Sequence, residues 1–255
     1  MVRFWRISRI LSEVTINKPK QMERRNIESF ALCGNAGSGK DLAFTIMKIL
    51  LAWDSGKIRR PVSGPELLAY KNDTGWLLNF LNLRADRFAG PIKTCIAGFL
   101  NVNIETLNAD EFKQQELPPA YFTPTKPRIT VREAHQIIGD MLKEAFNIDI
   151  FALSMIDRIQ TSSGTPTAVL DLRYPNEAAV LRANNIKIIK IVKDNQGELM
   201  QHSSEQHIND IDADFVLHND GISIGNFASN VLRMMQEFGW VSENLSIANI
   251  IQDNF

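Results

Sequence analysis

The sequence has little cysteine and almost no net charge, and it contains no long apolar run. Its two cysteines, Cys33 and Cys95, are too few for a disulfide framework, which indicates a reducing compartment such as the cytoplasm. The net charge of −1 gives no overall field that would attract nucleic acid or an anionic membrane surface. No apolar run approaches the roughly 18 residues that a membrane-spanning helix needs, so we expect no membrane segment.

The length and composition are those of an ordinary globular protein. At 255 residues, the chain can form one large α/β domain with its own core, or that domain with a small insertion. Apolar residues make up 44% and charged residues 22%, as in typical soluble domains. Internal repeats and low-complexity stretches are absent from the sequence.

The most informative stretch runs from Glu28 to Leu51. Its apolar residues Phe30–Cys33 predict a buried strand, which ends at a glycine. The residues after that strand spell G-x-x-x-x-G-K, namely Gly34, Asn35, Ala36, Gly37, Ser38, Gly39 and Lys40. Apolar side chains then recur at helical spacing. Strand, glycine turn and helix in this order are the context that a phosphate-binding loop requires.

The residue types in this motif suit an anion. Glycines let the backbone wrap closely, so that several N–H groups face inward, and the following helix adds its unsatisfied N-terminal donors. Lys40 would supply a point charge for the β- and γ-phosphates of a nucleotide. The alternative is a glycine-rich turn that only packs between a strand and a helix.

Two residues depart from the usual motif. The position after the lysine is commonly Ser or Thr, whose hydroxyl binds Mg²⁺, whereas Asp41 and then Leu42 stand here. A carboxylate can hold Mg²⁺ directly or through water, because Mg²⁺ prefers oxygen ligands and keeps several waters. We therefore expect Asp41 to be a metal ligand next to the bound nucleotide.

Strand and helix patterns alternate along the rest of the chain, which predicts a parallel sheet with helices on both faces. We expect the further strands at Arg84–Ala89, Thr167–Leu172, Ile186–Val192 and Asp214–Leu217. We expect helices at Pro65–Leu83, Gly90–Leu100, Thr130–Phe146 and Ile150–Ile159, from Asn176 onward, and at Gly221–Phe238. Ligands of such sheets bind beyond the carboxyl ends of the strands.

The domain organisation follows from these patterns. We expect an N-terminal basic arm at residues 1–27, a main domain at 28–240 and a C-terminal tail without clear signal at 241–255. Residues 101–129 look irregular and proline-rich, so a helical insertion around 101–160 is expected on the substrate side. The arm is consistent with a transit peptide, a nucleic-acid-binding arm or a simple extension before the core, and we favour the extension.

Six blocks in order resemble the deoxynucleoside monophosphate kinases of tailed phages. They are Gly34–Asp41, Arg87–Lys93, Thr130–Gly139, Asp171–Glu177, His202–Glu205 and Asp214–Gly221. This family commonly has Asp after the loop lysine, but it has Thr where Leu42 and Asp140 stand here. The resemblance implies a P-loop NTPase-type, nucleoside monophosphate kinase-like fold that uses ATP and Mg²⁺. Because phosphoryl transfer needs positioning and the exclusion of water more than a strong base, we expect the polar loop with His202 and Glu205 to close over the site; His202 could instead be an ordinary surface residue.

The resemblance implies roles for residues downstream of the loop. Arg132 would hold the acceptor phosphate with its planar fork, and Gln136 would read the base or sugar. Asp171 would organise Mg²⁺ or the acceptor, and Arg173 would face phosphate. Arg87 and Lys93 would contact the acceptor phosphate.

Each role has a structural alternative. Arg132 could be a solvated charge, Gln136 a packing residue, and Asp171 a member of a salt bridge. Arg173 could pair with Glu177, which is itself expected to cap a helix or form an ion pair.

The resemblance implies transfer of the ATP γ-phosphate to a free deoxynucleoside 5′-monophosphate, in the cytoplasm of an infected bacterium if the protein is phage-encoded. Lys40, Arg132, Asp171 and Arg173 would be catalytic, and nucleic acid and membranes are not expected partners. Alternatives are a kinase of hydroxymethylpyrimidine in phage DNA, a small-metabolite kinase similar to dephospho-coenzyme A kinase, and a non-catalytic nucleotide-binding switch or assembly protein. The sequence leaves open which bases are accepted and whether the protein forms a homodimer.

Overall fold

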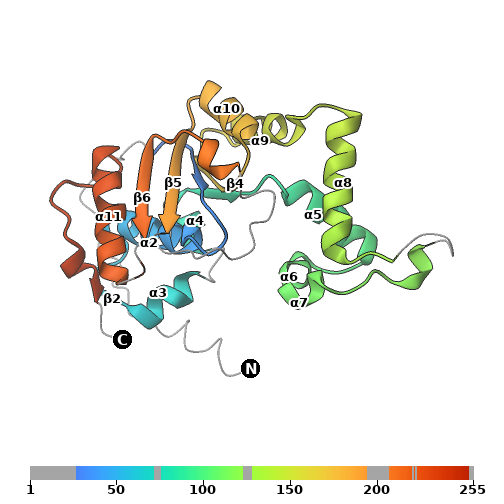
Figure 1. Ribbon diagram of the computed structural model, residues 1–255. Coiled ribbons are helices and arrows are strands. Elements are labelled where there is room, and N and C mark those ends of the chain that lie inside the picture. The colour runs from blue at the N-terminus through green and yellow to red at the C-terminus, as the bar shows by residue number, and fades with distance from the viewer. Residues whose placement is uncertain are drawn as a thin grey trace.

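The protein is an α/β structure with a five-stranded parallel sheet flanked by helices (Figure 1). The computed structural model describes residues 27–71, 76–122, 128–193, 207–219, 221 and 223–252. The strands are β1 (Phe30–Cys33), β3 (Arg84–Asp86), β4 (Thr167–Leu172), β5 (Lys187–Lys193) and β6 (Phe215–Asn219). Their order in the sheet is β3-β4-β1-β5-β6, so β1 lies at the centre.

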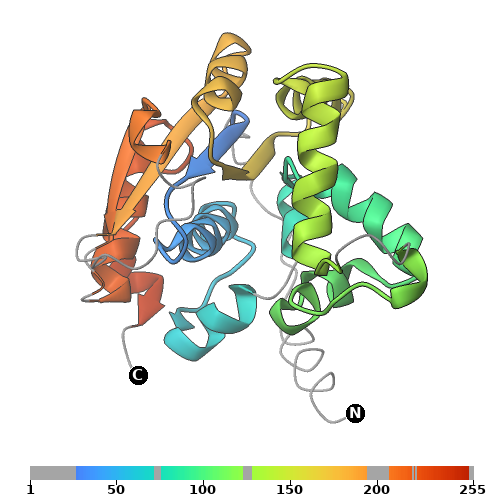
Figure 2. The same cartoon turned by 45° about the vertical axis from the view of Figure 1, so that its right-hand side comes forward.

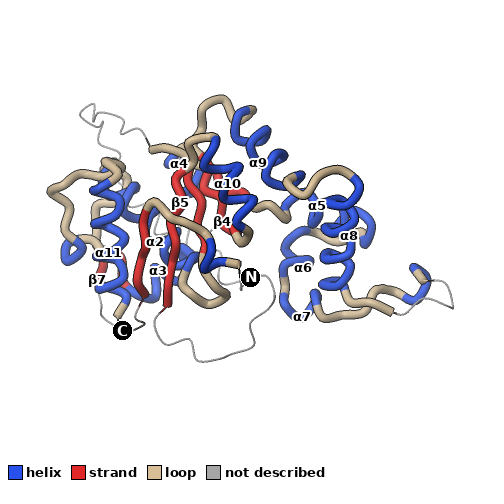
Figure 3. Tube along the Cα trace, turned by 45° about the horizontal axis from the view of Figure 1, so that its top comes forward, coloured by secondary structure: helices blue, strands red, loops and turns tan. Residues whose placement is uncertain are grey.

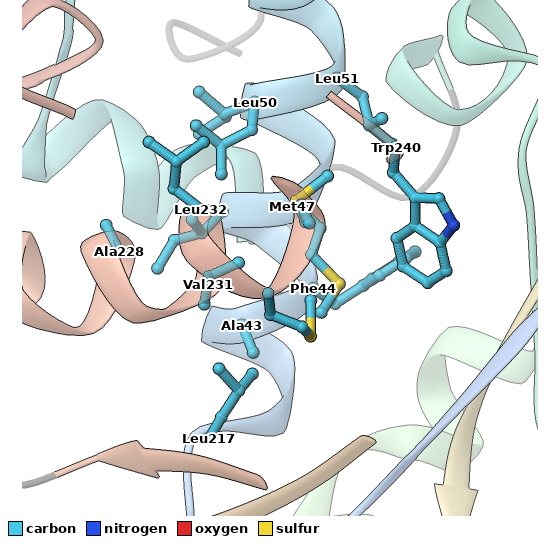
Figure 4. Close-up of a cluster of buried hydrophobic side chains, with 14 of the residues drawn as sticks. Ala43, Phe44, Met47, Leu50, Leu51, Leu217, Ala228, Val231, Leu232 and Trp240 are labelled. Atoms are coloured by element: carbon cyan, nitrogen blue, oxygen red, sulfur yellow. The ribbon is translucent and has the colours of Figure 1, made fainter. Parts of the chain in front are cut away.

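Side chains alternate between the two faces of β1, and each face has its own apolar cluster. Phe30 and Leu32 pack against helices α2 (Lys40–Asp54) and α11 (Ile224–Glu237). Figure 4 shows the contact between these two helices, with Ala43, Met47 and Leu50 of α2 in one cluster with Ala228, Val231 and Leu232 of α11. On the other face, Ala31 and Cys33 pack against α9 (Ile150–Gln160) and α10 (Pro175–Ala183). The sheet is therefore covered on both faces, as predicted.

A third apolar cluster belongs to helices that stand beside the sheet. They are α5 (Gly90–Leu100), α6 (Ile104–Asn108), α7 (Asp110–Lys113) and α8 (Val131–Ala145). Figures 1 and 2 both show this group, in green, lying to one side of the strands, and Figure 3 shows the same arrangement with the top of the molecule tilted toward the viewer. Its core includes Ile92, Ile96, Leu107 and Val131.

Local signals fix the ends of two helices in this group. Pro91 lies in the first turn of α5, where its missing N–H leaves no hydrogen bond unmade. Thr130 caps α8: Glu133 donates its N–H to Thr130 Oγ1, while its carboxylate accepts the N–H of Thr130. Both helices lie where the sequence predicted them, at Gly90–Leu100 and Thr130–Phe146.

Several element boundaries differ from those predicted. Residues 101–122 are not simply irregular, because they hold α6, α7 and the 3₁₀ turn η1 (Pro119–Tyr121). Asn103 Oδ1 accepts the N–H of Thr106 and so caps α6. Of the expected helix at 65–83, the structure describes α3 (Gly64–Lys71) and α4 (Trp76–Leu81), and residues 72–75 lie outside the described part. Strand β3 ends at Asp86, three residues before the predicted end.

The C-terminal residues pack onto the domain. Trp240, Val241 and Ile250 are buried in the cluster beneath α2 and α11. The short strand β7 (Ile251–Gln252) pairs in parallel with β2 (Val62–Ser63), a contact that the sequence did not predict. The chain as far as residue 252 is thus part of the core rather than a separate tail. Across the described ranges, no helix combines the length and apolar character needed to cross a membrane.

Candidate functional site

The glycine loop, residues 34–39, joins the carboxyl end of β1 to the start of α2. Gly34 has a φ of 150°, and a Cβ built there would lie 2.4 Å from the carbonyl oxygen of Ile191 in β5. The loop can therefore lie against β5 only because position 34 has no side chain. The sequence predicted this loop and its two flanking elements.

The far end of the loop is held by β6. Gly39 has a φ of 104°, and a Cβ there would lie 2.6 Å from Nδ2 of Asn219. The same Nδ2 donates to the carbonyl oxygen of Ser38 at 2.9 Å. Asn219 thus fixes the loop by a side-chain hydrogen bond, a role that spacing along the sequence could not reveal.

Lys40 is folded back over the loop. Its Nζ donates to the carbonyl oxygens of Gly34 at 2.6 Å and Asn35 at 2.8 Å. Helix α2 begins at Lys40 without a side-chain N-cap, because Gly39 occupies the cap position. The N–H groups of a first helical turn lack intrahelical acceptors, so an ammonium group and an uncapped helix end lie together here.

Other loop residues differ in exposure. Ser38 is buried, and among the described residues neither its Oγ nor Oδ1 of Asn35 has a hydrogen-bond partner. Ala36 and Gly37 are exposed at the tip of the loop. Leu42 packs its side chain against the main apolar cluster, so only its backbone would be placed to contact a ligand of the loop.

Asp41 connects the start of α2 with the turn after β3. Its Oδ1 lies 3.5 Å from Nη2 of Arg87, and the two side chains are 58% and 43% exposed. An ion pair this exposed contributes little to stability. The contact nevertheless brings together Asp41 and Arg87, two predicted site residues that lie far apart in the sequence.

Asp171 holds the turn between β3 and α5. Its Oδ1 accepts the N–H of Phe88 at 2.8 Å, and the N–H of Ala89 also points to the carboxyl. Burial raises the pKa of Asp171, while these N–H groups and the charges of Arg87 and Arg173 oppose the rise. Asp171 is therefore committed to the backbone of this turn, which leaves Asp41 as the more accessible of the two predicted metal ligands.

A set of cations surrounds Lys93, in the first turn of α5. Its Nζ donates to Oδ1 of Asn108 in α6 at 2.7 Å. Burial lowers the pKa of Lys93, and the charges of Arg87 and Lys113 lower it further, against the opposing effect of Asp171. Positive charge is thus concentrated around a partly buried ammonium. Asn108 and Lys113 lie in the region predicted to be irregular, and sequence reasoning missed both.

The structure places Arg132 and Gln136 on α8, at the edge of this cationic region. Arg132 is half-buried, and its Nε has no hydrogen-bond partner within the described residues. Its positive charge contributes to lowering the pKa of Asp110, after the larger effect of Lys113. Gln136 is exposed. His135 lies between them, with Nδ1 2.7 Å from the carbonyl oxygen of Val131, and burial lowers its pKa.

Glu177 caps α10, as one of the sequence alternatives predicted. Its carboxylate accepts the N–H groups of Arg173 and Tyr174, each at 3.3 Å. Burial raises the pKa of Glu177 to about 7, and the nearby charge of Asp171 adds to the rise. Glu177 is therefore a structural residue that fixes the chain at Arg173. The predicted loop residues His202 and Glu205 lie outside the described residues.

A cavity of about 560 Å³ lies between α2, β3, α5 and α6. Of the predicted site residues described, Asp41, Arg87 and Lys93 line it, whereas Lys40, Arg132, Asp171 and Arg173 do not. Its apolar wall includes Phe44, Leu78, Ala85 and Leu170, and its other polar residues include Thr45, Lys48, Asp86, Asn108 and Arg158. This combination of an apolar wall and a cationic rim suits a ligand with a ring and an anionic group.

No group of three or more His, Cys, Asp or Glu side chains is placed to hold a metal ion in the part of the chain that the structure describes. A cation at this site would therefore need oxygens from a bound ligand or water in addition to Asp41. Comparison with models of known protein families and with curated protein sequences gives no match.

Proposed function

We propose that the protein is an ATP-dependent kinase of deoxynucleoside 5′-monophosphates with a P-loop NTPase-type, nucleoside monophosphate kinase-like fold. In this proposal, the γ-phosphate of Mg²⁺-ATP is transferred in line to the acceptor phosphate, giving a deoxynucleoside diphosphate and ADP. The glycine loop would hold the triphosphate, with Lys40 moving from the loop carbonyls to the β- and γ-phosphates. The resemblance of six sequence blocks to the phage enzymes supports this assignment.

One observation carries the proposal. The cavity extends from Asp41, in the first turn of α2, to the cations Arg87 and Lys93 on the other side. Asp41, the residue directly after Lys40, therefore shares one space with these cations, whereas the glycine loop itself is not part of the cavity lining. Phosphoryl transfer depends on positioning two phosphate groups and neutralising their charge, more than on a strong base.

The proposal assigns roles within this space. Arg87 and Lys93, which line the cavity, would neutralise the acceptor phosphate together with Arg173 from outside the lining, and the apolar wall beside Phe44 would receive the base. Arg132 and Gln136 would approach the acceptor from α8. Asp41 would hold Mg²⁺ directly or through water, with the remaining ligands supplied by phosphate oxygens and water.

The test is a phosphotransfer assay with labelled ATP and a panel of acceptors. We expect label in deoxynucleoside diphosphate when at least one of the four free monophosphates is supplied. Label that appears only in DNA containing hydroxymethylpyrimidine would favour the DNA kinase instead. Nucleotide binding without a labelled product from any acceptor would contradict the kinase proposal and favour a switch or assembly protein.

A further inference from the structure

The backbone of Arg87 is held from both sides by one ion pair. Asp86, the last residue of β3, accepts the N–H of Arg87 on Oδ1 at 2.7 Å. Arg158, on α9, donates from Nη2 to the carbonyl oxygen of Arg87 at 3.2 Å. The donor and the acceptor of a single residue are thus fixed by two side chains that also bind one another.

The ion pair has the geometry of a fork. Nε of Arg158 donates to Oδ2 of Asp86 at 2.9 Å, Nη2 lies 3.4 Å from Oδ1, and Nη1 donates to Oγ of Ser154 at 2.8 Å. The side chains are only 25% and 15% exposed. A planar guanidinium can make these contacts together, whereas the single ammonium of a lysine cannot.

The next residue of the turn is also fixed, because Phe88 donates its N–H to Asp171. Within this turn, the side chain of Arg87 is left to reach across the cavity toward Asp41. Asp86 and Arg158 line the same cavity, but their hydrogen-bonding groups are directed at each other and at the backbone of Arg87, with further contacts to Arg84 and Ser154. These contacts indicate that the two residues hold the backbone of Arg87 in place and do not contact a ligand directly.

We propose that Arg158 and Asp86 are positioning residues that aim the guanidinium of Arg87 at the acceptor phosphate. This inference rests on the proposed function, and it adds two residues that neither the motif nor the resemblance marks. The pair holds the peptide groups on both sides of the Arg87 Cα, so it sets the direction in which the side chain leaves the backbone. Misplacing a binding group by about 1 Å can reduce a rate by about 100-fold.

The test compares Arg158→Lys and Asp86→Asn with the control Arg60→Lys, which alters an exposed ion pair with Glu66. We expect both test variants to raise the KM for the deoxynucleoside monophosphate by at least about tenfold. The KM for ATP should stay within about twofold of wild type, because the glycine loop is unchanged. Arg60→Lys should leave the KM for the monophosphate and the KM for ATP unchanged.

A merely structural role predicts a different pattern. Thermal stability and the fraction of active protein would fall, kcat would fall with it, and the acceptor KM would stay at the wild-type value; that result would overturn the inference. Asp86→Asn keeps the shape of the side chain and its acceptor for the Arg87 N–H. It therefore decides the question if Arg158→Lys does not fold.

Failure of the proposed function can be told apart from failure of this inference. If wild type phosphorylates no monophosphate, calorimetry with inorganic phosphate tests Arg87 directly. Phosphate binding that is lost in Arg87→Ala and at least about tenfold weaker in Arg158→Lys would support the positioning role without any kinase activity. Phosphate binding that Arg158→Lys leaves unchanged, or no binding by wild type, would overturn it.

Discussion

Nη2 of Arg87 lies 3.5 Å from Oδ1 of Asp41, so the turn after β3 meets the first turn of α2 across the mouth of the cavity. Both residues are proposed to bind ligands, one a phosphate and the other a metal ion. An entering phosphate would compete with Asp41 for the guanidinium of Arg87. Its binding would release the Asp41 carboxylate toward Mg²⁺, which couples acceptor binding to metal binding.

The first prediction concerns Asp41→Asn. Loss of the carboxylate should raise the Mg²⁺ concentration needed for half-maximal activity by roughly 10- to 100-fold, the range seen when groups that support a metal are removed. The measurement is a Mg²⁺ titration of initial rates at saturating ATP. Glu237→Gln, which alters an exposed ion pair on α11, is the control. An unchanged Mg²⁺ requirement in Asp41→Asn would show that this carboxylate does not hold the metal.

The second prediction concerns the backbone of the glycine loop. Gly34→Ala places a Cβ against the Ile191 carbonyl at a positive φ, so the free energy of unfolding should fall by about 1–3 kcal/mol or more. Gly98→Ala is the matched control, because nothing lies within 4 Å of its new Cβ in helix α5. It should raise stability by about 0.5–1 kcal/mol. Equal effects of the two substitutions in urea unfolding would contradict the loop geometry.

The third prediction follows from the raised pKa of Glu177. Folding raises the pKa of this carboxyl from 4.5 to about 7, so the folded state binds the proton more tightly than the unfolded chain. The contribution of Glu177 to stability is therefore present below about pH 4.5, and it is lost as the pH rises to about 7. The loss should be about 3 kcal/mol.

Urea unfolding between pH 5 and pH 8 tests this prediction. Wild type should lose stability relative to Glu177→Gln as the pH rises, because glutamine does not ionise. Glu144→Gln, at an exposed position of α8, should follow wild type throughout. A constant difference between wild type and Glu177→Gln over the whole range would mean that Glu177 keeps its ordinary pKa.

The fourth prediction separates the two thiols. Cys33 is buried in β1, and burial raises the pKa of its thiol to about 11, whereas Cys95 is exposed on α5. Because the thiolate is the reactive form, one thiol should react rapidly with a disulfide reagent at pH 8, and two after unfolding. Rapid reaction of both thiols in the folded protein would contradict the placement of β1 at the centre of the sheet.

Much of the sheet could be predicted because its signals are local. Strand β4 has the bounds expected from its apolar run, and α8 (Val131–Ala145) lies within one residue of each end of the predicted helix Thr130–Phe146. The apolar pattern of α8 predicted the helix but not its surroundings. Ile137 and Met141, two of its apolar side chains, remain 45% and 60% exposed in the described structure. Helical spacing shows which residues share a side, but not how far a neighbouring helix reaches.

The site was only partly predictable, for a related reason. Lys40 and Asp41 are marked by the motif, and Arg87 and Lys93 by the resemblance. Asn219, Lys113 and the Asp86–Arg158 pair depend on contacts between distant segments, such as the 2.9 Å bond from Arg158 to Asp86 across 72 positions. A single sequence contains no local sign of such a pairing.

The most direct test of the central claim is the binding of a bisubstrate analogue, in which adenosine and a deoxynucleoside are joined through five phosphates. By calorimetry, wild type should bind the analogue more tightly than it binds ATP. Lys40→Ala and Arg87→Ala should each weaken its binding by about 10- to 100-fold, since each removes a charged hydrogen-bond donor. Lys187→Ala, at the end of β5 that is far from the glycine loop, should bind the analogue as tightly as wild type does. An analogue that binds no more tightly than ATP, or that binds equally well to Lys40→Ala, would contradict the account.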